Sequence, residues 1–415
     1  MATSGEYNYA VTGTNIMTEA LELIGVLALG ATIDSNDSTS VLRSLNTMIK
    51  GWQAKHACLW TQKEVCIFLQ EDTYSYDLGP SGDHWCKTAP ATQYLKTEVA
   101  TAAAAAATSV TIDSVTGLTD TFDRNGIITA VTPGGAGAIT LDGALVTSSV
   151  AYLSGERKLL IYSDGADTGV TFACVGTDGN GVAVTETVTG PGAGLTVYST
   201  SLFKTVTSVT ISGAGTGNIE VGQVGDHIGF EIADGTVQWT FFKAALSTTA
   251  QFVTALTSAV AVDNHVYIYT TRPPRPTEII EARLNSAADT DRDINIKSRA
   301  EYMALSDKDS TGSANMVYYD AQRTAGVLKV WPACSDVQET LRLTVRIPIE
   351  DMDAVGNNPD FPQEWFDALS WNLAIRIAPK FGKKLDREFR MTAREFLTDA
   401  IEFDREYAST FIEVA

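Results

Sequence analysis

Two short stretches of the chain place a histidine two residues before a cysteine, His56-Ala-Cys58 and His84-Trp-Cys86. Two imidazoles and two thiolates could hold Zn²⁺ in a tetrahedron, but the cysteines of a zinc finger normally lie two to four residues apart. The spacing therefore favours two histidines near element ends and two small thiols in partly apolar surroundings. We expect no metal and no cofactor.

Two acidic stretches, TDTFDRNG (119–126) and DTDRDIN (289–295), faintly resemble calcium-binding loops. Neither contains the full ligand set of such a loop, so solvated turns are the favoured interpretation. The chain also lacks the GxxxxGK[ST], GxSxG and HExxH motifs. The glycine-rich stretches VTPGGAGAIT (131–140) and TGPGAGLTV (189–197) lead into strands and are predicted to be hairpin loops. We expect no catalytic residues and no enzymatic activity.

One basic segment stands out in an acidic protein. The chain has 50 acidic and 30 basic residues, whereas residues 376–394 contain seven basic residues against Asp386 and Glu388. These seven residues form either a solvated helix face or a patch that binds an acidic partner or a neighbouring subunit, in which arginine pairs with two carboxylate oxygens. We call them the basic patch; they are Arg376, Lys380, Lys383, Lys384, Arg387, Arg390 and Arg394.

Four tryptophans near the two chain ends are candidate anchors for a partner, because buried aromatic side chains dominate protein interfaces. The alternative is ordinary packing in a hydrophobic core. They are Trp52, Trp60, Trp365 and Trp371.

Apolar spacing predicts helices at both ends of the chain. A first helix is expected from about residue 14 to Gly30, and a second follows the N-cap candidates of DSNDSTS. Near the other end, a helix containing Phe366 and Ile377 should break at Pro379 and Gly382, and a longer one should begin near Lys383. These helices are predicted to form one bundle assembled from both termini.

The middle of the chain is predicted to be rich in strands. Short β-type runs separated by turn residues every 8 to 12 positions are typical of a β-sandwich, and TDGNG (177–181) is a hairpin signal. The fold class is therefore α+β and multidomain. We favour a nested organisation over a single β domain: a core of 1–96 and 272–415 that includes a β segment at 265–350, a small β module of 97–122 and 223–271, and an inserted sandwich of 123–222.

Composition limits the function. A net charge of −20 disfavours binding to the nucleic-acid backbone or to anionic membranes. The longest apolar stretch, 16–31, is too short to span a bilayer, and the first residues lack the basic and apolar regions of a signal peptide. Five scattered cysteines favour free thiols in a reducing compartment. We expect a soluble protein made in a cytoplasm.

Outside the middle region, the sequence resembles the head-to-tail adaptors of short-tailed bacteriophages, also called tail accessory factors or head-tail connectors. The resemblance covers roughly 14–96 and 272–410. Its most specific part is IPIEDMDAVGNNPDFPQEWFDALSWNLAIRIAPKFG (347–382), which combines F-P-x-E-W, an N-L-A tripeptide and an A-P-x-[FY]-G break. Three further stretches also carry the resemblance: DSTSVLRSLNTMIKGWQAKHACLW (37–60), TRPPRPTEIIEARLN (271–285) and EYMALSDKDSTGSANMVYYDAQRTAGVLKVWP (301–332).

The resemblance implies a virion protein at the head-tail junction that forms a ring, typically of twelve subunits, beneath the portal. Such a ring extends the DNA channel, through which the genome passes without sequence-specific binding, and docks tail, nozzle or fibre proteins. The middle insert resembles immunoglobulin-like sandwiches of phage structural proteins. Two alternatives remain: a carbohydrate-binding or adhesion protein that acts through this insert, and a cell-wall hydrolase, for which the sequence singles out no acid pair.

Overall fold

The computed structural model describes residues 9–55, 59–88, 93–233, 235–286 and 288–404. Helices account for 19% of the chain and strands for 36%, so the fold is mixed α and β with strands predominating. The chain divides into two compact units. We call residues 1–62 with 348–415 the helical unit, and residues 63–347 the strand unit.

This division differs from the one expected from sequence. We expected one core of the helices with residues 63–96 and 272–347, but these residues fall in the strand unit. The reason is that their strands pair with one another in shared sheets. The finer boundaries of the small β module and of the insert stay predictions.

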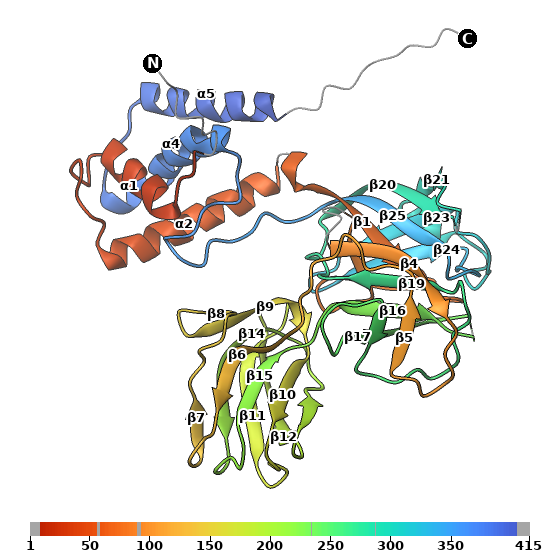
Figure 1. Ribbon diagram of the computed structural model, residues 1–415. Coiled ribbons are helices and arrows are strands. Elements are labelled where there is room, and N and C mark those ends of the chain that lie inside the picture. Colours follow the sequence, from red (N-terminus) through yellow and green to blue (C-terminus); the bar gives the residue numbers. More distant parts are fainter. Residues whose placement is uncertain (1–8, 56–58, 89–92, 234, 287, 405–415) are drawn as a thin grey trace, which may run out of the picture. The chain divides into compact units, whose positions relative to one another are not determined.

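The helical unit combines segments from both ends of the chain (Figure 1). Its helices surround one hydrophobic core that includes Ile16, Leu45 and Leu373, each fully buried. The elements are α1 (Gly13–Leu23), α2 (Ser35–Gln53), η1 (Leu59–Thr61), η3 (Gln363–Trp365), α4 (Phe366–Ile377), η4 (Ala378–Phe381) and α5 (Arg387–Phe403).

Two helix boundaries differ from the sequence prediction. Helix α1 ends at Leu23 instead of near Gly30, because Gly25 adopts a left-handed conformation with φ of 65° and its N–H bonds to the Glu22 carbonyl at 2.9 Å. Helix α5 begins at Arg387, four positions later than predicted, because the Asp386 side chain caps it by accepting from the Phe389 N–H. Of the several N-cap candidates in DSNDSTS, Asp34 caps α2, and the predicted break at Gly382 is confirmed.

The strand unit contains five sheets among its described residues. Their order is nested, because strands from the beginning and the end of the unit share sheets, and the strands between them form sheets of their own. Sheet order β21-β20-β25-β1-β3 and sheet order β2-β24-β23-β22 both join strands from before and after the middle region. Their bounds are β1 (Gln62–Phe68), β2 (Ser75–Leu78), β3 (Trp85–Lys87), β20 (Glu278–Asn285), β21 (Asp291–Asp293), β22 (Asn295–Ile296), β23 (Met316–Asp320), β24 (Gly326–Trp331) and β25 (Thr340–Arg346), with a short helix α3 (Arg299–Met303).

A six-stranded sheet of order β17-β16-β19-β4-β5-β18 comes next in the nesting. It consists of β4 (Tyr94–Thr101), β5 (Ser109–Ile112), β16 (His227–Glu231), β17 (Val237–Phe241), β18 (Thr249–Gln251) and β19 (His265–Tyr269). We call it the carrier sheet, because the innermost strands lie between β5 and β16 in the chain.

The innermost strands, at residues 123–223, form two sheets that share one hydrophobic core; we call them the two-sheet segment (Figure 1). One sheet has the order β13-β10-β15-β6 and the other β12-β11-β14-β9-β8, with β7 paired to β14. Their bounds are β6 (Asp123–Val131), β7 (Gly137–Ile139), β8 (Val146–Thr147), β9 (Val150–Arg157), β10 (Leu159–Ser163), β11 (Thr171–Thr177), β12 (Ala183–Thr189), β13 (Leu195–Tyr198), β14 (Phe203–Ile211) and β15 (Ile219–Gln223).

Hairpin predictions in the two-sheet segment are partly confirmed. The TDGNG turn joins the antiparallel strands β11 and β12, and the Asp178 side chain accepts the N–H groups of Asn180 and Val182. The prediction of hairpin loops at 131–140 and 189–197 was wrong. Each of these stretches connects strands of different sheets, β6 to β7 and β12 to β13, because both strands of each pair find other partners.

Candidate interaction surface

The seven side chains of the basic patch are positioned by α4, η4 and α5. Helix α4 buries Leu369 and Leu373 in the core, and Gly382 directly after η4 has a φ of 66°, which suits its role as the left-handed C-cap. The chain then turns and continues into α5, which buries Ala393 and Ala400. All seven basic residues are therefore left exposed on the outer side of these elements.

Two of the seven side chains are engaged within the helical unit. The Lys380 ammonium donates to the Ser44 hydroxyl of α2 at 2.6 Å and to the Ser40 carbonyl at 3.2 Å. The Lys383 ammonium donates to the Gly25 carbonyl, just beyond α1, at 3.0 Å. These lysines link the C-terminal segment to the N-terminal helices, a role that their sequence pattern did not indicate.

The other five side chains have no ion pair or hydrogen bond with any residue that the structure describes. They are Arg376, Lys384, Arg387, Arg390 and Arg394. Arg387 and Arg390 lie in the first turns of α5, at the positive end of the helix dipole, where a cation costs about 0.3–1 kcal/mol. Helix stability therefore does not explain their presence at these positions.

The four tryptophans all pack against aromatic rings of their own unit. Trp365 is 1% exposed and lies 5.3 Å from Trp60 and 5.9 Å from Trp52, measured between ring centroids. Trp371 lies 4.6 Å from Phe389 of α5. Trp365 therefore belongs to the core. For the three half-buried tryptophans, a role as partner anchors stays a prediction.

Of the two histidine-cysteine stretches, the one at His56 and Cys58 lies outside the described residues. His84 stacks on Trp239 at 4.1 Å between centroids, and Cys86 is buried opposite Cys66 in the β1–β3 ladder. Burial raises the pKa of Cys66 to about 11 and that of Cys86 well above its usual value. Within the described part of the chain, no group of three or more histidine, cysteine or acidic side chains is arranged to hold a metal ion.

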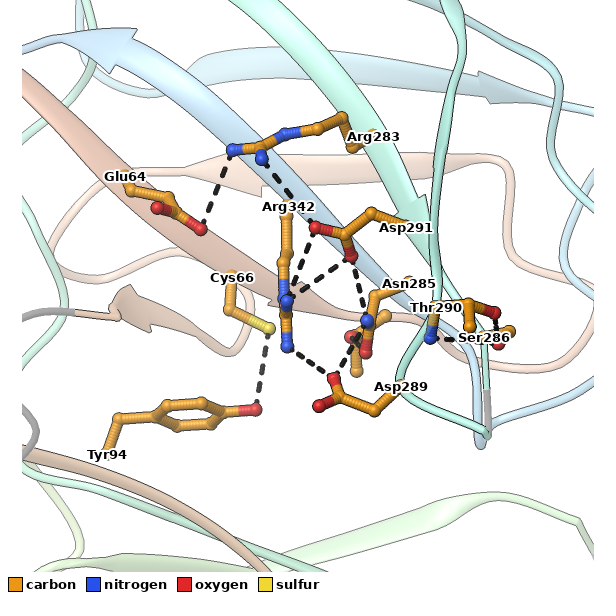
Figure 2. Close-up of polar contacts among 11 residues, drawn as sticks. Glu64, Cys66, Tyr94, Arg283, Asn285, Ser286, Asp289, Thr290, Asp291 and Arg342 are labelled. Atoms are coloured by element: carbon orange, nitrogen blue, oxygen red, sulfur yellow. Dashed lines mark hydrogen bonds and ion pairs between the residues drawn. The ribbon is translucent and has the colours of Figure 1, made fainter.

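The acidic stretch 289–295 belongs to a cluster that sequence reasoning missed (Figure 2). The Arg342 guanidinium donates to Asp289 at 2.8 Å and to Asp291 at 3.3 Å, and the Asn285 amide donates to both carboxylates. The hydrogen bond from Asn285 and the charge of Arg342 lower the pKa of Asp289. These two carboxylates thus accept hydrogen bonds from an arginine and an amide side chain of the same chain. Only the register of β20 and β25 brings Arg342 to them.

A pocket of about 380 Å³ opens beside this cluster. Arg342 and Asp289 line it together with Lys96, Glu98 and His265, among other residues. The Lys96 ammonium is buried without a hydrogen-bond partner among the described residues, and its pKa is lowered chiefly by that burial. Cations and carboxylates are mixed in this pocket, so its charge selects no single class of ligand.

A second unanticipated cluster lies where the two-sheet segment meets the carrier sheet. Arg157 and Asp226 form a fully buried ion pair, and Arg272 lies 3.5 Å from Glu156. The Tyr269 hydroxyl accepts from Arg272 at 3.2 Å and lies 2.6 Å from Nδ1 of His84. Such a network fixes one segment on another, since each buried charge needs its partner.

Comparisons with known proteins add nothing to this geometry, because no protein-family model and no curated protein sequence matches the chain. No helix in the described part of the chain is long and apolar enough to cross a membrane. A functional assignment therefore rests on the residues and their arrangement.

Proposed function

We propose that this chain is a structural protein of a virion, a head-to-tail adaptor that forms a ring beneath the portal, extends the DNA channel and docks the tail. The observation that carries the proposal is the group of five exposed cations without intramolecular partners on α4, α5 and their connection. In an acidic protein, such a group fits an acidic partner surface, here the portal or a neighbouring subunit.

The charge distribution supports this proposal in a second way. Residues 97–271 contain 15 acidic and 5 basic residues, and this net negative charge disfavours binding of the nucleic-acid backbone. A channel through which DNA passes under pressure benefits from walls that do not bind it. In this proposal the helices form a bundle, the two-sheet segment is an inserted immunoglobulin-like sandwich that contacts tail or fibre proteins, and no chemical reaction is performed.

Assembly on a portal tests the proposal directly. The purified chain is mixed with purified portal complexes of the same virus, and the product is analysed by sedimentation and electron microscopy. We expect a ring of added density, of twelve copies by the resemblance, on the face of the portal away from the capsid. Free chain that sediments separately at all concentrations, with bare portals in the images, would contradict the proposal.

A further inference from the structure

A pocket of about 460 Å³ lies where the two-sheet segment meets the carrier sheet, and none of the basic-patch residues lines it. One wall comes from β6, β10 and β13 of the two-sheet segment, and the other from the loop of residues 243–245 after β17. The loop is held in place because the Asp120 carboxylate accepts the Leu246 N–H at 3.0 Å and the Lys243 N–H donates to the Gln251 carbonyl at 2.9 Å. Junctions between such segments are a common location of ligand sites.

Two of the few basic side chains of the acidic stretch 97–271 line this pocket. Residues 97–271 contain only five basic residues. Arg157 is buried against Asp226, and the Lys204 ammonium donates to the Leu153 carbonyl at 3.1 Å. Of the remaining three, Arg124 and Lys243 both line this pocket. Two of the five cations of this stretch are therefore in one pocket, and the ion pairs around them decide how much positive charge is available there.

The polar side chains of the pocket are open to a ligand. The Lys243 ammonium, the Asn125 amide and the Thr196 hydroxyl have no hydrogen bond with any residue that the structure describes. Arg124 is the exception, since it is ion-paired with Glu220. With Glu220 neutralising Arg124, one positive charge, that of Lys243, remains uncompensated in the pocket.

The rest of the lining is apolar and includes a flat surface. The Arg124 guanidinium lies 4.5 Å above the centre of the Tyr162 ring, and a planar guanidinium on an aromatic ring favours stacking with further flat groups. Phe122, Leu160, Ala244 and Ala245 supply the remaining walls. A ligand that matches these walls carries its negative charge on a compact apolar body.

From these observations, we propose that the pocket between β6, β10, β13 and the 243–245 loop binds a small organic anion, a carboxylate or phosphate group carried on a flat apolar body. Lys243 pairs with the anionic group, Asn125 and Thr196 hydrogen-bond its oxygens, and the Arg124 guanidinium, which the Tyr162 ring supports, stacks on the flat apolar body. This inference is independent of the proposed role in a virion, since it uses none of the residues of the basic patch.

The test is calorimetric titration of the full chain with four probes: benzoate, phenyl phosphate, inorganic phosphate and the neutral analogue benzyl alcohol. We expect saturable binding of benzoate or phenyl phosphate at millimolar concentration, at least tenfold weaker binding of benzyl alcohol, and weaker binding at high salt, because a charge-assisted hydrogen bond is lost or screened. The tighter of the two organic anions identifies the head group. Tighter binding of inorganic phosphate than of both organic anions would overturn the role of the apolar walls.

Two variants and a matched control locate the binding. Lys243→Gln should weaken the better organic anion roughly tenfold or more. Tyr162→Ala should weaken it while leaving the affinity for inorganic phosphate unchanged. Lys158→Gln removes another lysine of the two-sheet segment that does not line the pocket, and should bind like the unmodified chain. If neither organic anion binds, or if Lys243→Gln and Lys158→Gln bind equally well, the proposal is wrong.

Discussion

The guanidinium of Arg157 donates a hydrogen bond of 2.7 Å to the carboxylate of Asp226, and both side chains are almost completely buried. Arg157 ends β9 of the two-sheet segment, whereas Asp226 directly precedes β16 of the carrier sheet. The hydroxyls of Thr121 and Thr270 also donate to Asp226, at 2.5 Å and 3.1 Å. One carboxylate therefore ties the entry and exit of the inner segment to the sheet that carries it.

Replacing this carboxylate should be strongly destabilising. Asp226→Asn leaves the Arg157 charge buried without its counter-charge, and breaking a buried pair costs about 3–5 kcal/mol. Chemical denaturation followed by circular dichroism measures the loss. Asp113→Asn is the matched control, because Asp113 is exposed and its stability effect should be within about 0.5 kcal/mol. Equal stability of the two variants would show that the pair does not hold the segments together.

Acid should weaken the strand unit through two buried histidines. Burial, and then the charge of Arg272, lower the pKa values of His84 and His227 well below their usual range. Nδ1 of His84 faces two donors, the Tyr269 hydroxyl and the Arg272 guanidinium, so it must be an unprotonated acceptor. For His227, the neighbouring charges are those of Arg272 and Arg157.

The sign of this pH dependence follows from the lowered pKa values. Above the unfolded pKa of about 6.5, both histidines are neutral in the folded and the unfolded chain, and their contribution to stability is complete. Below it, the unfolded chain binds a proton that the folded chain does not, so each histidine lowers the free energy of unfolding by about 1.4 kcal/mol per pH unit. Urea denaturation between pH 7.5 and pH 5.5 measures this loss. In the His84→Gln variant, the free energy of unfolding should depend less steeply on pH, by about 1.4 kcal/mol per pH unit, which is the contribution of one proton. Carboxylates with shifted pKa values, such as Glu156, are present in both proteins and cancel. An identical slope in the variant would exclude His84 as a contributor.

Trp365 distinguishes core packing from partner binding. Its ring is 1% exposed, and Trp→Ala substitutions in a core cost about 3–5 kcal/mol because a cavity is left behind. Trp365→Ala should therefore lower the stability of the helical unit by this amount, as measured by thermal unfolding. Met391→Ala, at an exposed position of α5, should change it by less than about 0.5 kcal/mol. A stable Trp365→Ala variant that failed only in assembly would instead favour the anchor role.

Charge reversal of the basic patch should weaken assembly without unfolding the chain. Lys384, Arg387 and Arg390 are suitable targets, because they are exposed and have no described partner, whereas Lys383 holds the Gly25 carbonyl. Substituting glutamate at the three positions should weaken portal binding roughly tenfold or more, with an effect that shrinks at high salt.

The matched control for this prediction reverses three exposed cations outside the basic patch. Lys55→Glu, Arg299→Glu and Arg323→Glu together change the net charge as much as the patch variant does, at side chains with no described partner. Portal binding and melting temperature should both stay close to those of the unmodified chain. If the control and the patch variant bind alike, the five cations form only a solvated face.

Local pattern was sufficient for much of the fold. The spacing of Leu369, Leu373 and Ile377 predicted a helix whose buried face contains those residues, since an apolar stripe can be buried only on one side of a helix. The TDGNG turn predicted the β11–β12 hairpin for a similarly local reason. Prediction was wrong at residues 131–140 and 189–197, where glycine-rich stretches cross between sheets and strand pairing far away in sequence decides the path.

The sequence by itself determined the acidic character of the chain, the helical ends, the strand-rich middle and the concentration of cations at 376–394. Tertiary structure alone decided which charges are available. It engaged Lys380 and Lys383 with the N-terminal helices, buried Arg157 against Asp226, and brought Arg124 and Lys243 to one pocket. The physical reason is that the sequence does not show whether a charged side chain is surrounded by water, by a carboxylate or by an empty pocket. Contacts between residues far apart in the chain decide which of these surrounds it.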